Sequence, residues 1–237
     1  PLLDKFLFTE RFSFASTDSV LVIGLGRFGT AVAQSLISLG HEVMGIDTDE
    51  DRVQSWGHHL THAVQADASN VQTLRQLGAA DFKHAVVGIG DNLSASLLAV
   101  MALVELGIQD IWVKATNTEH GQIAERIGAH HVVYPEAAMG ERVAHLVTGK
   151  MIDFIEFDDG FAIAKLQSPV ECHNLTLDES HVREIHGVTV VGVKRINEDF
   201  KYAKPDTLVR PGDLLIVSGP TRNIERFASK SALKKKG

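Results

Sequence analysis

A glycine-rich turn is the part of this sequence whose residue types and spacing best suit ligand binding. Gly24, Gly26 and Gly29 follow the apolar segment Val20–Ile23 in the order Gly-x-Gly-x-x-Gly. In such a pattern the first glycine permits a tight turn, the second lets a pyrophosphate approach the backbone, and the third lets a helix pack closely on the strand. The N–H groups and the dipole at the start of that helix attract phosphate. The turn therefore predicts a nucleotide site.

An acidic residue completes the pattern. After a helical segment over 30–39 and Gly40, a second apolar segment over 43–46 ends at Asp47. An acid about 20 residues beyond the glycines can accept hydrogen bonds from ribose hydroxyls. The same carboxylate would repel the 2′-phosphate of NADP. We therefore favour nucleotide binding over a glycine turn that only packs, and a ligand other than NADP.

Charged side chains at predicted strand ends extend this site. Arg27 lies inside the glycine turn, and we interpret it as a phosphate ligand, for its own nucleotide or for one in a neighbouring chain, rather than as an exposed arginine tolerated in a turn. Asp67 follows a predicted strand over 62–66, where it can cap the next helix or face a ligand. Lys114 ends another strand, and Glu136 follows the last one.

The elements that must position these residues alternate between strand and helix. Short apolar segments are separated by helical patterns as far as Val133, which predicts a doubly wound parallel sheet with right-handed crossovers. The predicted strands are 20–23, 43–46, 62–66, 85–89, 111–114 and 131–133. Pro135 is expected to break regular structure before a helix over 139–148, which has no strand to cross to and is expected to pack on a partner subunit.

A different pattern begins near Met151. Segments 152–157 and 161–166 flank Asp159-Gly160 and predict a hairpin with a type I′ turn. A helix over 175–185, strands over 188–196 and 214–217 and a helix over 221–227 complete a small α+β lobe. The expected organisation is an N-terminal segment over 1–19, a Rossmann-like domain with a linker helix over 20–150, the α+β lobe over 151–230 and a basic tail over 231–237. The first segment, rich in phenylalanine, is interpreted as a strand, a docking segment or a disordered lead-in.

Composition limits the classes of function. The 237 residues carry a formal charge of −7, which disfavours broad nucleic-acid binding. A single cysteine, Cys172, allows no intrachain disulfide and fits a reducing cytosol. No apolar run approaches the ~20 residues of a membrane-spanning helix, and the N-terminus lacks the shape of a signal peptide. A role at a membrane is therefore expected to act through a partner.

Catalytic motifs are missing from the sequence. Tyr134 and Tyr202 lack the lysine four residues later that short-chain dehydrogenases use, and neither Gly-x-Ser-x-Gly nor a Walker A motif occurs. A nucleotide fold alone does not make an enzyme. We therefore predict a protein that binds a nucleotide without turning it over, with a small NAD-dependent oxidoreductase as the less favoured alternative.

Motifs spread over most of the chain point to one family. They are GLGRFG, Asp47, Asp67-Ala68-Ser69, Ile111-Trp112-Val113-Lys114-Ala115 and Tyr134-Pro135-Glu136-x-x-Met139-Gly140. Together they resemble the RCK (regulator of K⁺ conductance) family, and within it the KtrA/TrkA type of cytosolic potassium-transport subunit. The resemblance runs from about Val20 to Phe227. It implies a Rossmann-like RCK N-lobe followed by a small RCK C-lobe of the TrkA-C type.

The resemblance also implies roles for individual residues. It places the phosphates among Gly24, Gly26, Arg27, Phe28 and Gly29, with Arg27 reaching the nucleotide of a neighbouring subunit. It assigns the ribose to Asp47 and the surroundings of the adenine to Asp67 and Ala68, and it places Lys114 near the nucleotide pocket. It assigns Glu136 to a cation (Mg²⁺, Ca²⁺ or Na⁺) at a dimer interface.

The implied function is a non-enzymatic switch. In proteins of this type, dimers assemble into a ring, commonly an octamer, on the cytoplasmic face of a membrane K⁺-translocating subunit of the KtrB/TrkH type, and ATP and ADP favour different ring shapes. Some relatives bind cyclic di-AMP at the C-lobe, here expected near 188–193 and 202–205, although no basic cluster marks that stretch. The alternative within the family is a TrkA-like regulator that prefers NAD(H).

Overall fold

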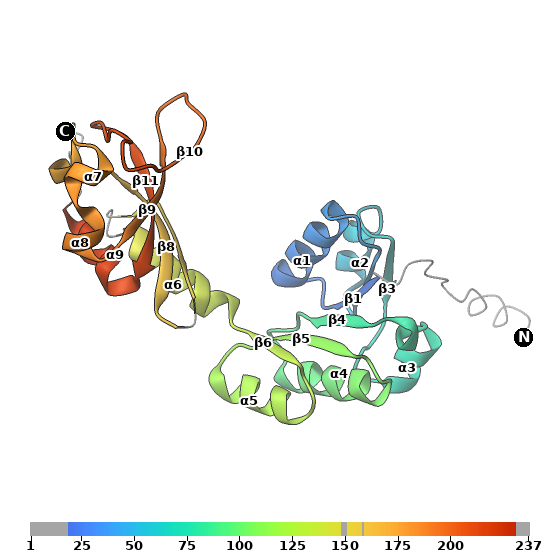
Figure 1. Ribbon diagram of the computed structural model, residues 1–237. Helices are drawn as coiled ribbons and strands as arrows, with labels where there is room; N and C mark the ends of the chain where they lie inside the picture. The colour runs from blue at the N-terminus through green and yellow to red at the C-terminus, as the bar shows by residue number, and fades with distance from the viewer. Residues whose placement is uncertain (1–18, 148–150, 158, 231–237) are drawn as a thin grey trace, which may run out of the picture. The chain divides into compact units, whose positions relative to one another are not determined.

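The computed structural model describes residues 19–147, 151–157 and 159–230 (Figure 1). The chain divides into two compact units, Pro1–Glu136 and Ala137–Gly237, and each is described by itself. The predictions made for residues 1–18 and for the basic tail over 231–237 lie outside the described residues.

The first unit is built on a parallel six-stranded sheet. Its strands are β1 (Val20–Ile23), β2 (Val43–Asp47), β3 (His62–Gln65), β4 (His84–Val87), β5 (Asp110–Lys114) and β6 (His131–Val133). Their order across the sheet is β3-β2-β1-β4-β5-β6, and every neighbouring pair is parallel. This is the doubly wound order, and it confirms the Rossmann-like prediction.

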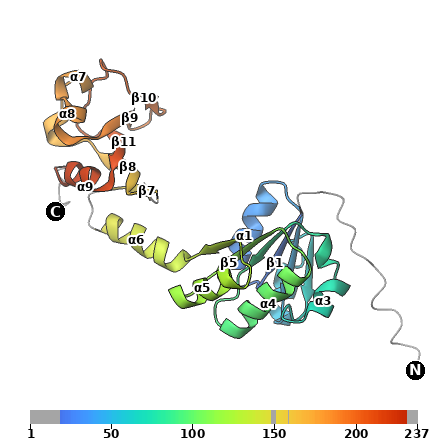
Figure 2. The ribbon, with the colours of Figure 1, turned by 60° about the horizontal axis from the view of Figure 1, so that its bottom comes forward.

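Helices cover both faces of this sheet. The helices are α1 (Arg27–Ser38), α2 (Glu50–Trp56), α3 (Val71–Gln76), α4 (Leu93–Glu105) and α5 (Thr118–Arg126), with a 3₁₀ turn at Ala79–Asp81. Figures 1 and 2 show α1 on one side of the sheet and α3, α4 and α5 on the other. Two apolar clusters match these layers. The larger centres on Leu21, Ile111 and Leu103, and the smaller on Val22, Val43 and Ala33.

Short polar side chains set where most of these helices begin. The side-chain oxygens of Asp49, Asn70, Asn92 and Asn117 accept backbone N–H groups at the starts of α2, α3, α4 and α5. Such caps satisfy donors that have no partner inside the helix. The idea that Asp67 caps α3 was therefore wrong, because Asn70 holds that position.

Helix α6 (Pro135–Val147) begins earlier than the sequence pattern suggested. Proline was expected to interrupt regular structure, yet Pro135 is the first residue of the helix. At that position its missing N–H costs nothing and its fixed φ suits the helix. The early start places Glu136 in the first turn of α6.

The second unit is built on an antiparallel five-stranded sheet. Its strands are β7 (Asp153–Glu156), β8 (Phe161–Gln167), β9 (Thr189–Lys194), β10 (Lys201–Tyr202) and β11 (Leu214–Pro220), in the order β10-β9-β11-β8-β7. The other elements are a 3₁₀ turn at Val170–Cys172, α7 (Leu177–Ser180), α8 (Val182–His186) and α9 (Thr221–Ser229). Phe227, Ile224 and Leu166 are fully buried in its core, which confirms the small α+β lobe.

Two local predictions in this lobe were wrong. The single helix expected over 175–185 is divided into α7 and α8 at His181, whose φ of 46° is left-handed. The hairpin between β7 and β8 does not have a two-residue type I′ turn. Glu156 pairs with Ala162, and the N–H of Phe157 donates to Phe161 O, so three residues separate the paired positions. Gly160, the last of the three, has a left-handed φ of 74°.

Within residues 19–147, 151–157 and 159–230, no helix combines the length and the apolar character needed to cross a bilayer.

Candidate functional site

The glycine turn lies where the strand order of the first sheet reverses. Gly24 follows β1 and Gly88 follows β4, the two strands on either side of the switch point. The N–H of Gly24 donates to Ile46 O and the N–H of Gly88 donates to Ile23 O, both at 2.7 Å. A Cβ added to Gly88 would lie 3.3 Å from Gly24 O. In open α/β sheets the crevice beside this point is where ligands bind.

The glycines of the turn have the distinct roles that the motif requires. Gly24 has φ 92°, which favours glycine. A Cβ on Gly29 would lie only 1.8 Å from Gly24 O, so this glycine lets α1 approach β1. A Cβ on Gly26 would meet nothing closer than the Arg52 Nη1 at 4.0 Å, which leaves room over the backbone. The N-cap residue of α1 is Gly26, which has no side chain with which to cap the helix. The turn therefore fits a phosphate group.

Asp47 connects the glycine turn to the next loop. Its side chain is almost fully buried, and its Oδ2 accepts the N–H of Leu25 at 2.6 Å. Its Oδ1 accepts the N–H of Asp49 at 2.9 Å. A carboxylate has about four lone-pair sites, so it retains capacity for a ribose hydroxyl. The residue therefore shapes the glycine turn in addition to its predicted role at the ribose.

Arg52 is a site residue that the sequence reading missed. Its Nη1 lies 3.4 Å from the Oδ2 of Asp47, and its Nε lies 3.5 Å from Asp49. Arginine near the acid of a dinucleotide fold can accommodate a 2′-phosphate. Asp47 is thus not a bare negative charge, and its presence alone is weaker evidence against NADP than we expected. The available signal was a basic residue one helical turn beyond Asp49.

Lys114, Phe28 and Glu136 come together at the carboxyl edge of the sheet. The Lys114 Nζ is 2.7 Å from the Oε1 of Glu136 and 5.9 Å from the centre of the Phe28 ring. A Cβ on Gly90 would lie 3.1 Å from the same amino group, so Lys114 extends over the end of β4. The Lys114 side chain is only 14% exposed, whereas that of Glu136 is 67% exposed. The ion pair therefore joins a largely desolvated cation to an accessible anion.

The electrostatics around Glu136 link it to the glycine turn. The hydrogen bond from Lys114 lowers the pKa of Glu136, and the positive charges of Lys114 and Arg27 contribute in the same direction. Arg27 itself is exposed at the first position of α1. Two cationic side chains and a helix N-terminus thus lie beside one carboxylate. This arrangement suits an anion, or an anion together with a cation bound by Glu136.

Asp67 and Ala68 follow β3 at the same edge of the sheet. Asp67 is exposed, and its Oδ1 accepts both the N–H and the hydroxyl of Ser69, which lowers the pKa of the Asp67 carboxyl. Ala68 is buried in the larger apolar cluster. These contacts make a local turn. The placement of Asp67 and Ala68 near the adenine stays a prediction.

The second unit holds a hollow of about 700 Å³ between β9, β10 and the loop before β11. Four basic side chains, Arg195, Lys201, Lys204 and Arg210, are among its lining residues, together with Phe200 and Tyr202. The sequence reading found no basic cluster here because these residues are spread over 195–210. Glu198, Asp199 and Asp206 also line the hollow, so most of the positive charge is offset.

The fold defines a class of protein: a Rossmann-type unit, with a candidate nucleotide site at the carboxyl edge of its sheet, followed by a small antiparallel lobe. Family models agree with that division, since the TrkA-N domain matches residues 20–135 and the TrkA-C domain matches residues 161–231. Among curated proteins, "Ktr system potassium uptake protein C" of Bacillus subtilis is 36% identical over 207 residues, covering 87% of this chain and 94% of the relative. "Ktr system potassium uptake protein A" of Vibrio alginolyticus is 34% identical, covering 84% and 91%. The chain belongs to the TrkA-N/TrkA-C family that includes these Ktr proteins, and so to the RCK proteins it was predicted to resemble.

Solved structures show the same fold. The crystal structure of the GsuK RCK domain matches with a TM-score of 0.64 at 15% identity, covering 95% of this chain and 50% of that one. A GsuK channel bound to NAD matches with a TM-score of 0.50 at 23% identity, covering 90% and 38%. The prediction of a non-enzymatic role agrees with the Ktr relatives, which are named for potassium uptake rather than for a reaction.

Proposed function

We propose that this chain is a cytosolic, nucleotide-sensing regulatory subunit of a potassium uptake system. The observation that carries the proposal is the pairing of Lys114 with Glu136 beside Arg27 and the glycine turn. The identity to Ktr proteins over most of both chains supports the same role. On this proposal the protein binds peripherally to the inner face of the membrane, on a K⁺-translocating subunit of the KtrB/TrkH type.

The proposed ligand is an adenine nucleotide, with ATP and ADP favouring different conformations. The uncapped start of α1 and the space over Gly26 suit the shared phosphates. A terminal γ-phosphate brings further negative charge, and Lys114, Arg27 and a cation held by Glu136 would offset it. A ligand shifts a conformational equilibrium only through its different affinities for the two states. The additional phosphate supplies such a difference.

Assembly into dimers and an octameric ring is part of the proposal. Met139, Val143 and Val147 recur every four residues on α6 and are 54%, 44% and 78% exposed. An exposed apolar stripe on a helix is more stable when a partner covers it. An arginine exposed at the glycine turn is also free to reach a nucleotide in a neighbouring subunit.

Two ligand proposals remain beside ATP and ADP. NAD(H) is the alternative, since the glycine turn and Asp47 suit a dinucleotide equally. Cyclic di-AMP is proposed for the hollow lined by Lys201, Tyr202 and Lys204, where aromatic and basic side chains suit a base and a phosphate. A titration of the nucleotide-free chain that gives no heat with cyclic di-AMP would remove that second proposal.

Calorimetric titration with ATP, ADP and NADH, with and without Mg²⁺, tests the main proposal. We expect ATP and ADP to bind, and we expect Mg²⁺ to raise the affinity for ATP but not for ADP. Replacing Arg27 by alanine should lower the affinity for ATP about 10-fold or more and the affinity for ADP by less, because a charge-assisted contact to phosphate is lost. Glu136→Gln should remove the effect of Mg²⁺, whereas the control Arg126→Ala, on the last turn of α5, should change nothing.

Two results would contradict the proposal. An unchanged preference between ATP and ADP in Arg27→Ala would remove Arg27 from the switch. NADH binding far tighter than ATP would move the protein to the NAD(H)-sensing alternative, and turnover of NADH with a carbonyl substrate would revive the oxidoreductase hypothesis.

A further inference from the structure

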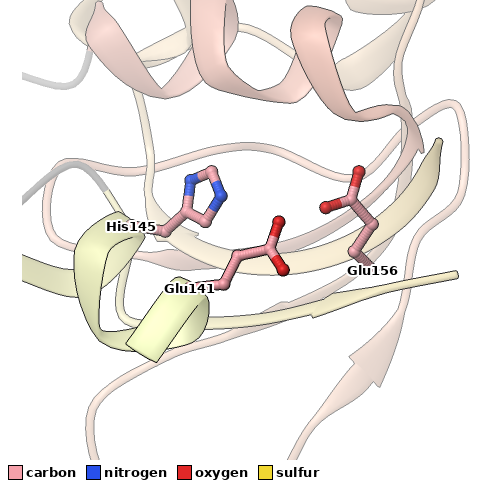
Figure 3. Close-up of side chains that lie close together, drawn as sticks. All are labelled: Glu141, His145 and Glu156. Carbon is pink, nitrogen blue, oxygen red and sulfur yellow. The ribbon is translucent and has the colours of Figure 1, made fainter. Parts of the chain in front are cut away.

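A cluster of metal-ligating side chains lies in the second unit, apart from the nucleotide site. Glu141 and His145 are four residues apart on α6, and Glu156 is the last residue of β7. One ligand atom from each of the three lies within 4.8 Å of the others. Figure 3 shows their side chains converging on one space from the helix and from the strand. Within the part of the chain that the structure describes, no second group of three meets the same criterion.

The ring of His145 contacts one side chain on α9 and one on β7. The Nδ1 of His145 lies 3.5 Å from the Oε1 of Glu225 on α9, and its ring packs against Phe154 with the ring centres 4.3 Å apart. Histidines that bind metals usually have one ring nitrogen held by a carboxylate, which fixes the tautomer and directs the other nitrogen to the ion. With Nδ1 directed to Glu225, Nε2 is the nitrogen that would coordinate.

The carboxylates are also placed to bind an ion. The Thr221 hydroxyl donates to the Oε1 of Glu156 at 2.5 Å, so the strand carboxylate is oriented while its second oxygen keeps its lone pairs. Glu141 and Glu156 bring two negative charges to one place. Arg142, the basic neighbour on α6, pairs with Asp153 at 2.5 Å. A dication would relieve the mutual repulsion of the two carboxylates.

We propose that Glu141, His145 and Glu156 bind a transition-metal dication, with Zn²⁺ as the physiological ion. One imidazole and two carboxylates are a ligand set typical of zinc, whereas Mg²⁺ and Ca²⁺ prefer oxygen ligands alone. Zinc ligands at about 2.1 Å from the ion lie about 3.4 Å from one another in a tetrahedron. Both glutamates are exposed, so rotation of their side chains closes the spacing without moving the backbone. Water or a further side chain takes the fourth position.

The ion would fix the last turns of α6 against β7. Residues 148–150, which connect these two elements, lie outside the described residues. A metal that binds the folded unit and not the unfolded chain raises stability in proportion to its affinity and concentration. Zinc is therefore expected to raise the melting temperature of the second unit, independently of nucleotide.

The test is a zinc titration of the full chain after treatment with EDTA and removal of the chelator. We expect one Zn²⁺ per chain by calorimetry, little competition from Mg²⁺, and a visible absorption band when Co²⁺ replaces Zn²⁺. His145→Ala and Glu156→Gln should each lower the affinity for zinc at least about 10-fold and abolish the rise in melting temperature that zinc causes. Glu156→Gln keeps the shape of its side chain, and circular dichroism confirms that both variants are folded.

The matched control is His84→Ala/His131→Ala. These two histidines flank Asp110, at 3.0 and 3.1 Å, and form another histidine–carboxylate cluster in the first unit. The double variant should bind zinc like the wild type. The proposal is overturned if the wild type binds no zinc, if His145→Ala binds it unchanged, or if the control loses it instead. ATP binding by His145→Ala should be unaltered, so this outcome is separable from that of the nucleotide proposal.

Discussion

Replacing Gly29 by alanine is the sharpest test of how the glycine turn packs against the strand before it. The added Cβ would lie 1.8 Å from Gly24 O, and real Cβ atoms essentially never come closer than 3.0 Å to such an atom. The turn and α1 must therefore separate by about 1.2 Å. The atom in the way belongs to a backbone that is itself held by the hydrogen bond from Gly24 to Ile46. A flexible side chain cannot absorb this movement.

The expected loss follows from two opposing terms. Overpacking of a well-packed site costs about 1–3 kcal/mol, and contact with backbone places this site near the upper end. Alanine inside a helix recovers about 1 kcal/mol relative to glycine. The net prediction is a fall of about 2 kcal/mol in the free energy of unfolding of the first unit. With a slope of about 2 kcal/mol per molar urea, the midpoint should fall by about 1 M.

Tryptophan fluorescence during urea unfolding is a suitable assay, because both tryptophans, Trp56 and Trp112, lie in the first unit. Gly57→Ala is the control. Gly57 already has helical φ and ψ, and its added Cβ would make only ordinary contacts at 3.5 Å. Its midpoint should stay or rise slightly. A Gly29→Ala midpoint equal to that of the wild type would refute the close approach of α1 to β1.

Two further substitutions test buried polar groups in the same unit. The two oxygens of the Asp47 carboxylate accept the N–H groups of Leu25 and Asp49, and an amide has only one oxygen to accept them. Asp47→Asn should therefore lower the free energy of unfolding of the nucleotide-free protein by about 1–3 kcal/mol, whereas the exposed control Asp67→Asn should change it by less than about 0.5 kcal/mol. Equal urea midpoints for the two variants would show that Asp47 does not stabilise the fold, which would leave it only its proposed role in binding the nucleotide. Burial lowers the pKa of His120, which contacts the buried Ser96 at 3.1 Å. Below a pH of about 6.5 the unfolded chain therefore takes up a proton that the folded chain resists, and stability falls by up to about 1.4 kcal/mol per pH unit. His120→Gln should make the dependence of the melting temperature on pH shallower between pH 7 and pH 5, and an unchanged slope would contradict this assignment.

Local pattern was sufficient for most of the fold. Short, mostly apolar segments identified the strands of the first unit, because a buried parallel strand needs apolar side chains on both faces. The first four segments are each followed by a glycine or an aspartate: Gly24, Asp47, Asp67 and Gly90. The glycine turn could also be predicted from the sequence, because positions that tolerate no side chain must be occupied by glycine. The helix break at His181 could not be predicted from the sequence, because a histidine does not require a left-handed conformation.

Contacts between residues distant in sequence were decided only by the tertiary structure. The sequence placed Lys114 and Glu136 at two strand ends, but their pairing depends on β5 and β6 lying side by side and on α6 starting at Pro135. Arg52 next to Asp47, and the four basic side chains around the hollow in the second unit, likewise come together only when loops pack. The grouping of Glu141 and His145 with Glu156 depends on how α6 packs against β7. Residue type and spacing therefore determined the fold and predicted the class of ligand. The partners of each charge depended on packing, because a side chain's electrostatic surroundings are set by whatever the chain brings near it.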